Sequence, residues 1–72
     1  NTQLSDQDRV VVVDDLIATG GTAVACAELL SEHFGVARQN ILVLALIDLP
    51  NLGGSDAIRQ GGFNVASLMA YT

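Results

Sequence analysis

The chain has 72 residues, half of them hydrophobic, and a formal net charge of −5 from eight acidic residues and three arginines, with no lysine. This charge excludes a surface that tracks a nucleic-acid backbone, the missing lysine excludes a Walker-type nucleotide loop, and no apolar run approaches the ~20 residues of a membrane span. The single cysteine, Cys26, can form neither a disulfide nor a thiolate metal site within the chain.

The size of the chain limits the core that it can form alone. A chain of this length buries only about 60 % of the surface that its unfolded form exposes. With no tryptophan and three aromatic residues, its apolar content is aliphatic, which is typical of parallel sheets covered on both faces. The first residue, Asn1, is not methionine. Together with the small core, this leads us to expect that the chain is a segment of a longer soluble enzyme. One cysteine is compatible with a reducing, cytoplasmic setting.

The first half of the chain predicts a loop, a strand and a helix. Residues 1–8 are mostly polar and predict a loop, and residues 9–14 predict a strand with valines on both faces. From Thr22 the hydrophobic period becomes that of a helix of about three turns. Gly35 is expected to end this helix at the C′ position. The apolar face of the helix is predicted to consist of Ala23, Cys26, Ala27, Leu30 and Phe34.

The second half predicts two further strands. The apolar run of residues 40–48 predicts a strand and completes a β-α-β unit. Such crossovers are right-handed in about 98 % of cases, so the two strands are expected to be parallel with the helix on one face. Ser55 is expected to cap a short helical turn over residues 55–59. A shorter, edge-like strand is predicted over residues 64–71.

The most informative stretch is residues 10–22, where an apolar strand leads into two aspartates and then into a loop of small residues that opens a helix. Gly20 and Gly21 allow backbone N–H groups to approach an anion closely, and the helix that begins near Thr22 directs its positive dipole end at that anion. The hydroxyls of Thr19 and Thr22 add donors. The stretch therefore predicts a site for a sugar phosphate.

Asp14 and Asp15 are predicted at the carboxyl end of the first strand, the edge where open α/β sheets bind ligands. Taken alone, the pair fits a polar cap of the strand, with the two side chains on opposite faces. Two carboxylates held close together repel each other unless hydroxyl donors or a cation compensate. Beside the small-residue loop, the pair is therefore expected to accept hydrogen bonds from a sugar that carries the bound phosphate.

Residues 13–22, Val-Asp-Asp-Leu-Ile-Ala-Thr-Gly-Gly-Thr, resemble the phosphoribosyl-pyrophosphate signature of the type I phosphoribosyltransferases, most closely that of the adenine-using branch. Residues 49–54 and the closing strand are similar to the connection and last strand of that branch. The resemblance thus covers the chain from Arg9 onward. It implies an α/β parallel-sheet fold, present here in part as a β-α-β unit plus a C-terminal strand, with residues 1–72 as the C-terminal part of a single domain.

The resemblance also implies a reaction and its residues. Phosphoribosyl pyrophosphate would react with adenine to give AMP and pyrophosphate, a step of purine salvage, in a homodimer. Asp14 and Asp15 would be the catalytic residues that hold the ribose, and magnesium would arrive bound to the substrate without a direct protein ligand. Leu49 would pack on the purine, although a core leucine fits its sequence context equally well. The 5-phosphate would be anchored by Ala18, Thr19, Gly20, Gly21 and Thr22.

The resemblance leaves the base open, because the hood, the mobile loop and the acidic residue that handles the base proton would all precede Asn1. A phosphoribosyltransferase for xanthine or orotate, a regulator that senses phosphoribosyl pyrophosphate without catalysis, and a purely structural β-α-β fragment are the alternatives. Among the remaining residues, His33 is expected at the helix end, Cys26 in the core and Met69 in the sheet. The isolated chain is expected to be neither stably folded nor active.

Overall fold

The computed structural model describes residues 7–71, so residues 1–6 of the predicted N-terminal loop lie outside the described residues. One three-stranded sheet has the order β1-β2-β3, and both strand pairs are parallel. Its strands are β1 (Val10–Ile17), β2 (Ile41–Asp48) and β3 (Asn64–Ala70). The α/β class, the parallel pairing of the first two strands and the edge position of the last strand are therefore confirmed within this range.

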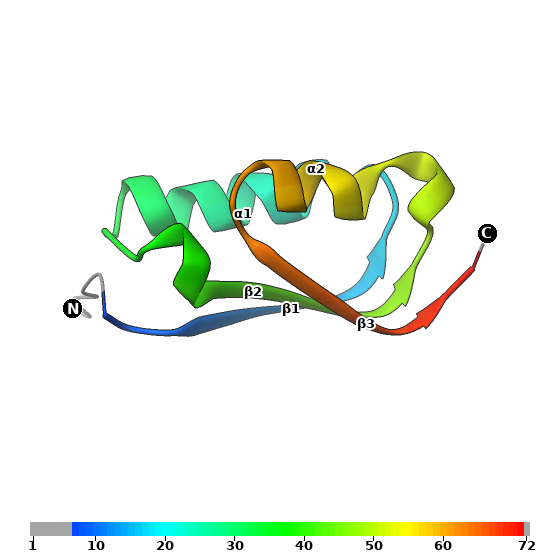
Figure 1. The fold of residues 1–72 in the computed structure, drawn as a ribbon, viewed down its shortest axis with the longest axis horizontal. Helices are drawn as coiled ribbons and strands as arrows, with labels where there is room; N and C mark the ends of the chain where they lie inside the picture. The colour runs from blue at the N-terminus through cyan, green and yellow to red at the C-terminus, as the bar shows by residue number, and fades with distance from the viewer. Residues whose placement is uncertain (1–6, 72) are drawn as a thin grey trace.

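Two helices connect the strands and lie on the same face of the sheet (Figure 1). Helix α1 (Gly21–Glu32) joins β1 to β2, and α2 (Gly54–Gln60) joins β2 to β3. Two short 3-10 turns, η1 (Arg38–Asn40) and η2 (Pro50–Leu52), precede β2 and α2. The sequence predicts one β-α-β unit, whereas the chain forms two in succession.

Several predicted boundaries were wrong in informative ways. Strand β1 continues to Ile17 because its pairing with β2 continues to Asp48, so the two aspartates lie inside the strand and not at its end. Strand β2 begins one residue later than predicted, since Asn40 belongs to η1. The Ser55 cap is also wrong, because Gly53 (φ +83°) is the N-cap residue and Ser55 lies buried inside α2.

The apolar face of α1 is narrower than the sequence predicts. Ala23 and Ala27 are buried against the sheet, whereas Cys26 and Phe34 are exposed. Because Cys26 is exposed, its predicted place in the core was wrong. The helix ends at Glu32 with His33 as the C-cap residue, so Gly35 lies one position beyond the predicted C′ position; it has φ +78°, and its N–H donates to the Ser31 carbonyl at 3.2 Å.

The core lies between the sheet and the two helices, and the opposite face of the sheet is open. In the described residues, Val13 is 74 % exposed and Leu68 is 72 % exposed on that open face. The sequence predicts cover on both faces, so this part of the chain supplies only one of the two layers. The buried core residues are Ile17, Ala23, Ala27, Val36, Ile41, Val43, Ala45, Ile58 and Phe63.

Arg38 links the C-terminal ends of the two helices. Its Nη1 donates to the carbonyl oxygen of Gly61, after α2, at 2.6 Å, and its Nη2 pairs with Glu32, the last residue of α1, at 3.1 Å. The guanidinium also lies 4.8 Å from the centroid of the Phe63 ring. Between residues 7 and 71, no helix is long and apolar enough to cross a membrane.

Candidate phosphate-binding site

The loop between β1 and α1 turns at Gly20, which has φ +82° and is the N-cap residue of α1. Few residues other than glycine adopt this conformation readily. Space adds a second restriction, because a Cβ atom at Gly20 would lie 2.7 Å from the carbonyl oxygen of Gly54. Gly20 is thus required both by the turn and by the backbone packed behind it.

The first turn of α1 leaves its backbone donors open. The first hydrogen bond across this end of the helix runs from the Val24 N–H to the Gly20 carbonyl at 2.8 Å. The N–H groups of Gly21, Thr22 and Ala23 therefore precede the hydrogen-bonded ladder. Within the described residues no side chain caps this end, and the first turn holds no acidic residue. Open donors at the positive end of a helix dipole are suited to bind an anion.

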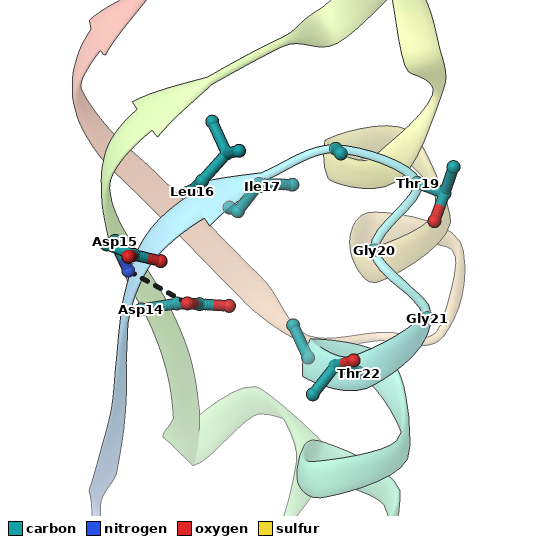
Figure 2. A pocket seen from close by; sticks show the side chains of 10 residues that line it. Asp14, Asp15, Leu16, Ile17, Thr19, Gly20, Gly21 and Thr22 are labelled. Atoms are coloured by element: carbon teal, nitrogen blue, oxygen red, sulfur yellow. Dashed lines mark hydrogen bonds between the residues drawn. The ribbon is translucent and has the colours of Figure 1, made fainter.

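A cavity of about 320 Å³ lies at this end of the sheet, and its lining is one continuous stretch, residues 14–23. Its volume lies within the range of roughly 300–1,000 Å³ that is usual for small-molecule sites. The stretch includes every residue predicted to anchor a phosphate or a sugar. Figure 2 shows Asp14 extending from the strand toward the first turn of α1, inside the curve of the loop.

Gly21 has free space in the direction in which a side chain would point. A Cβ atom built on Gly21 would meet nothing within 4 Å, and its φ lies outside the left-handed region. Neither backbone conformation nor packing within the described residues therefore requires a glycine here. A side chain at this position would project into free space beside the open N–H groups, where it would obstruct an approaching anion.

Asp14 and Asp15 both line the cavity, although alternation along a strand would separate them. The burial of β1 alternates as far as Asp15, and the break follows it, since Leu16 is exposed and Ile17 is buried. Asp14 is half-buried and its Oδ1 accepts the Asp15 N–H at 2.8 Å, whereas Asp15 is exposed. The two carboxylates therefore differ in burial, and both border the same cavity.

The charges around the cavity are all negative. Asp14 and Asp15 contribute two carboxylates, and none of the three arginines of the chain lines the cavity. In the part of the chain that the structure describes, no group of three or more metal-ligating side chains occurs. A bound phosphate must therefore be held by backbone donors and hydroxyls, and the carboxylates need a partner that brings hydroxyl groups or a cation.

Other residues singled out in the sequence lie outside this cavity. Leu49 is half-buried after β2, and its N–H donates to the Ile17 carbonyl at 2.9 Å, but it does not line the cavity. His33 is the C-cap residue of α1, as expected, and its ring packs edge-on against Phe34. Met69 lies in β3, as expected, and is 49 % exposed.

Two residues near the site were missed in the sequence. Asp48 ends β2 beside Ile17, is 6 % exposed, and its Oδ1 has no hydrogen-bond partner among the described residues. Because a buried carboxylate oxygen is costly without a donor, a donor from outside the described residues is expected there. The signal was an aspartate closing an apolar run, as at Asp14. The second is Gly54, which packs behind the loop and was noted in the sequence only as part of the connection over residues 49–54.

Comparisons with known proteins agree on one family. The family model for uracil phosphoribosyltransferase matches residues 1–65. The adenine phosphoribosyltransferase of Erythrobacter litoralis is 52 % identical over 63 residues, which are 88 % of this chain and 34 % of that protein. The chain thus spans about a third of the length of this curated relative.

Solved structures of adenine phosphoribosyltransferases share the fold. The Giardia lamblia enzyme complexed with 9-deazaadenine superposes with a TM-score of 0.82 at 34 % identity, covering 97 % of this chain and 38 % of that one. The Trypanosoma brucei enzyme in complex with AMP, pyrophosphate and ribose-5-phosphate has a TM-score of 0.73 at 27 % identity, covering 93 % of this chain and 30 % of that one.

Proposed function

The chain belongs to the phosphoribosyltransferase family, and from this premise we propose that it is the C-terminal part of an adenine phosphoribosyltransferase domain. The full-length protein would transfer the phosphoribosyl group of phosphoribosyl pyrophosphate to adenine, with release of pyrophosphate and formation of AMP. This reaction belongs to purine salvage. The proposal assigns to the described residues the binding of the ribose 5-phosphate part of the substrate.

One observation carries the proposal: the open N–H groups of α1 and the carboxylates of Asp14 and Asp15 line the same cavity. A phosphate monoester of a sugar presents an anion and hydroxyl donors at the two ends of one small molecule. The loop from Ala18 to Thr22 matches the anion, and the aspartates match the hydroxyls. Free phosphate would leave the two carboxylates without a partner.

The roles of the residues in the reaction follow from charge. Displacement at the anomeric carbon places positive charge on the ribose ring as pyrophosphate departs. Asp14 and Asp15 would hold the ring hydroxyls and favour that charge, while the loop keeps the 5-phosphate fixed as a pivot. Catalysis by this part of the protein is therefore positioning combined with electrostatic stabilisation.

Magnesium enters the proposal as part of the substrate. When bound to the pyrophosphate group, it would offset the negative charge of the leaving group beside the two aspartates. The carboxylate oxygens of Asp14 and Asp15 would approach it through its water ligands, without direct coordination. A homodimer and a cytoplasmic location complete the proposal, both from the resemblance to the family.

The base is the least constrained part of the proposal. The name of the matching family model contains uracil, while the curated relative and both solved structures use adenine in their names. In the proposal Leu49 covers one face of the purine, since it follows β2 at the same edge of the sheet as the cavity. Product analysis of the full-length protein with adenine, xanthine, orotate and uracil separates these enzymes, and a regulator would turn over none of them.

Replacing Asp15 with asparagine tests the ribose assignment, because Asp15 is exposed and its carboxylate accepts no hydrogen bond from the residues that the structure describes. Loss of one charge-assisted hydrogen bond is expected to cost about 1.5–3 kcal/mol in kcat/KM for phosphoribosyl pyrophosphate, or roughly ten- to a hundred-fold. Steady-state kinetics and thermal unfolding of the full-length protein are the measurements.

Asp56→Asn is the matched control, since it removes the same charge from an exposed residue of α2 that pairs with Arg59 at 3.3 Å and lies outside the cavity. Its kinetics should equal those of the parent protein. The ribose assignment is wrong if Asp15→Asn lowers the melting temperature but leaves kcat/KM unchanged.

A further inference from the structure

The N-terminus of α2 packs directly on the backbone of the phosphate-binding loop. A Cβ atom on Gly54 would lie 2.7 Å from the Gly20 nitrogen and would also collide with the carbonyl oxygen of Ala18. The third neighbour is the Cγ2 of Ile17, at 2.8 Å. Two of these three atoms belong to the backbone, which cannot swing aside as the end of a flexible side chain can. In Figure 2 the loop at Gly20 passes in front of this helix.

Gly54 is not a glycine for conformational reasons. It is the first residue of α2, and its φ lies outside the left-handed region. Alanine has a higher helix propensity than glycine, so local structure alone would favour alanine at this position. What excludes a larger residue is the close contact with the loop.

The connection between β2 and α2 contacts the end of β1 and the phosphate-binding loop at both the start and the end of the connection. At its start, the Leu49 N–H donates to the Ile17 carbonyl at 2.9 Å. At its end, Gly54 contacts Ala18 and Gly20. The segment that carries Leu49 and the loop that carries the anion donors are therefore held against each other by backbone contacts.

We propose that Gly54 is a positioning residue, which sets where the phosphate-binding loop lies relative to the connection that carries Leu49. The inference rests on the proposed function for the ligand, but the contact itself does not. It predicts that a single methyl group at Gly54 displaces the N–H groups of the loop and weakens phosphate binding, although α2 gains helix propensity.

The experiment compares Gly54→Ala with Gly53→Ala in the isotope-labelled full-length protein. Gly53 has φ +83° and nothing within 4 Å of its Cβ direction, so alanine there strains the backbone without touching the loop. Two readouts are needed: the amide chemical shifts of residues 18–22 without ligand, and the Kd for ribose 5-phosphate by calorimetry. Gly54→Ala is expected to raise the Kd at least about tenfold, the effect of losing one charge-assisted hydrogen bond to the phosphate. Gly53→Ala should lower the melting temperature with the loop amides and the Kd unchanged.

The outcomes separate the two proposals. Shifted loop amides in Gly54→Ala, with a parent protein that binds no ribose 5-phosphate, would support the positioning role and overturn the proposed function. Unshifted loop amides with an unchanged Kd would overturn the positioning role and leave the proposed function standing. If Gly54→Ala does not fold, Ile58→Val is the second variant. It removes one methylene from a fully buried side chain and so weakens the packing of α2 against the core. The positioning role then requires shifted loop amides in that variant, and unshifted ones contradict it.

Discussion

Replacing Gly21 with valine in the full-length protein is expected to weaken binding of phosphoribosyl pyrophosphate by more than about a hundredfold while the fold survives. The Gly21 Cβ direction is free of protein atoms and its φ suits any residue, so the valine can be accommodated. Its side chain would occupy the space beside the N–H groups of the first turn of α1. Loss of two charge-assisted hydrogen bonds at about 1.5 kcal/mol each corresponds to about a hundredfold in Kd. Calorimetry gives the Kd, and thermal unfolding gives the stability.

Gly35→Ala is the control for this prediction, because it changes a glycine at the other end of the same helix. Gly35 has φ +78° and open space around its Cβ direction, so alanine there should cost about 1 kcal/mol of stability and leave the Kd unchanged. Gly21→Val should show the reverse pattern, with the Kd raised and the melting temperature nearly unchanged. Equal affinity of the parent protein and Gly21→Val for phosphoribosyl pyrophosphate would show that the loop from Ala18 to Thr22 does not bind the phosphate.

The 72-residue chain expressed alone is expected to show no cooperative unfolding transition and no formation of AMP. Its helices cover one face of the sheet, and the other face exposes the apolar side chains of Val11, Val13, Leu46 and Leu68. Such a face, with open strand edges on either side, favours aggregation over a stable monomer. Thermal unfolding and an AMP assay beside the full-length protein test this expectation. A cooperative melt with turnover near that of the full-length protein would contradict it.

Two substitutions on the open face of the sheet provide a further test, because they should help the isolated chain and destabilise the full-length protein. Val13→Lys with Leu68→Lys should raise the solubility of the isolated chain, since both side chains are solvent-exposed there. In the full-length protein the same two changes should lower the melting temperature, because charges would be buried without partners under the second layer. Equal effects in both contexts would mean that nothing covers this face in the full-length protein.

The elements that could be predicted from the sequence are those with a strong local pattern. The valine run and the apolar run before Asp48 identified two strands, and their spacing around a helix identified the β-α-β unit. Gly35 marked the end of the helix to within one residue, because a positive φ at glycine is a local property. The loop of small residues was located for the same reason, since its chemistry is contained in consecutive residues.

The features that escaped the sequence depend on contacts between distant segments. Strand β1 extends past Asp15 because of its pairing with β2, which no local pattern of β1 reveals. Cys26 shares helical spacing with buried residues, but the position of the sheet decides which flank of α1 is covered. The role of Gly54 escaped the sequence because its contact with Gly20 joins two segments that are far apart in the chain. The break in alternation after Asp15, where Leu16 is exposed and Ile17 is buried, is likewise a product of the three-dimensional sheet.

The central claim is that the loop from Ala18 to Thr22 holds the 5-phosphate of the substrate while Asp14 and Asp15 hold its ribose. A crystal structure of the full-length protein with ribose 5-phosphate tests it most directly. The account predicts phosphate oxygens about 2.7–3.2 Å from backbone nitrogens at the start of α1, with ribose hydroxyls donating to the two aspartates. A phosphate bound elsewhere, or a ribose that contacts neither aspartate, would contradict the account.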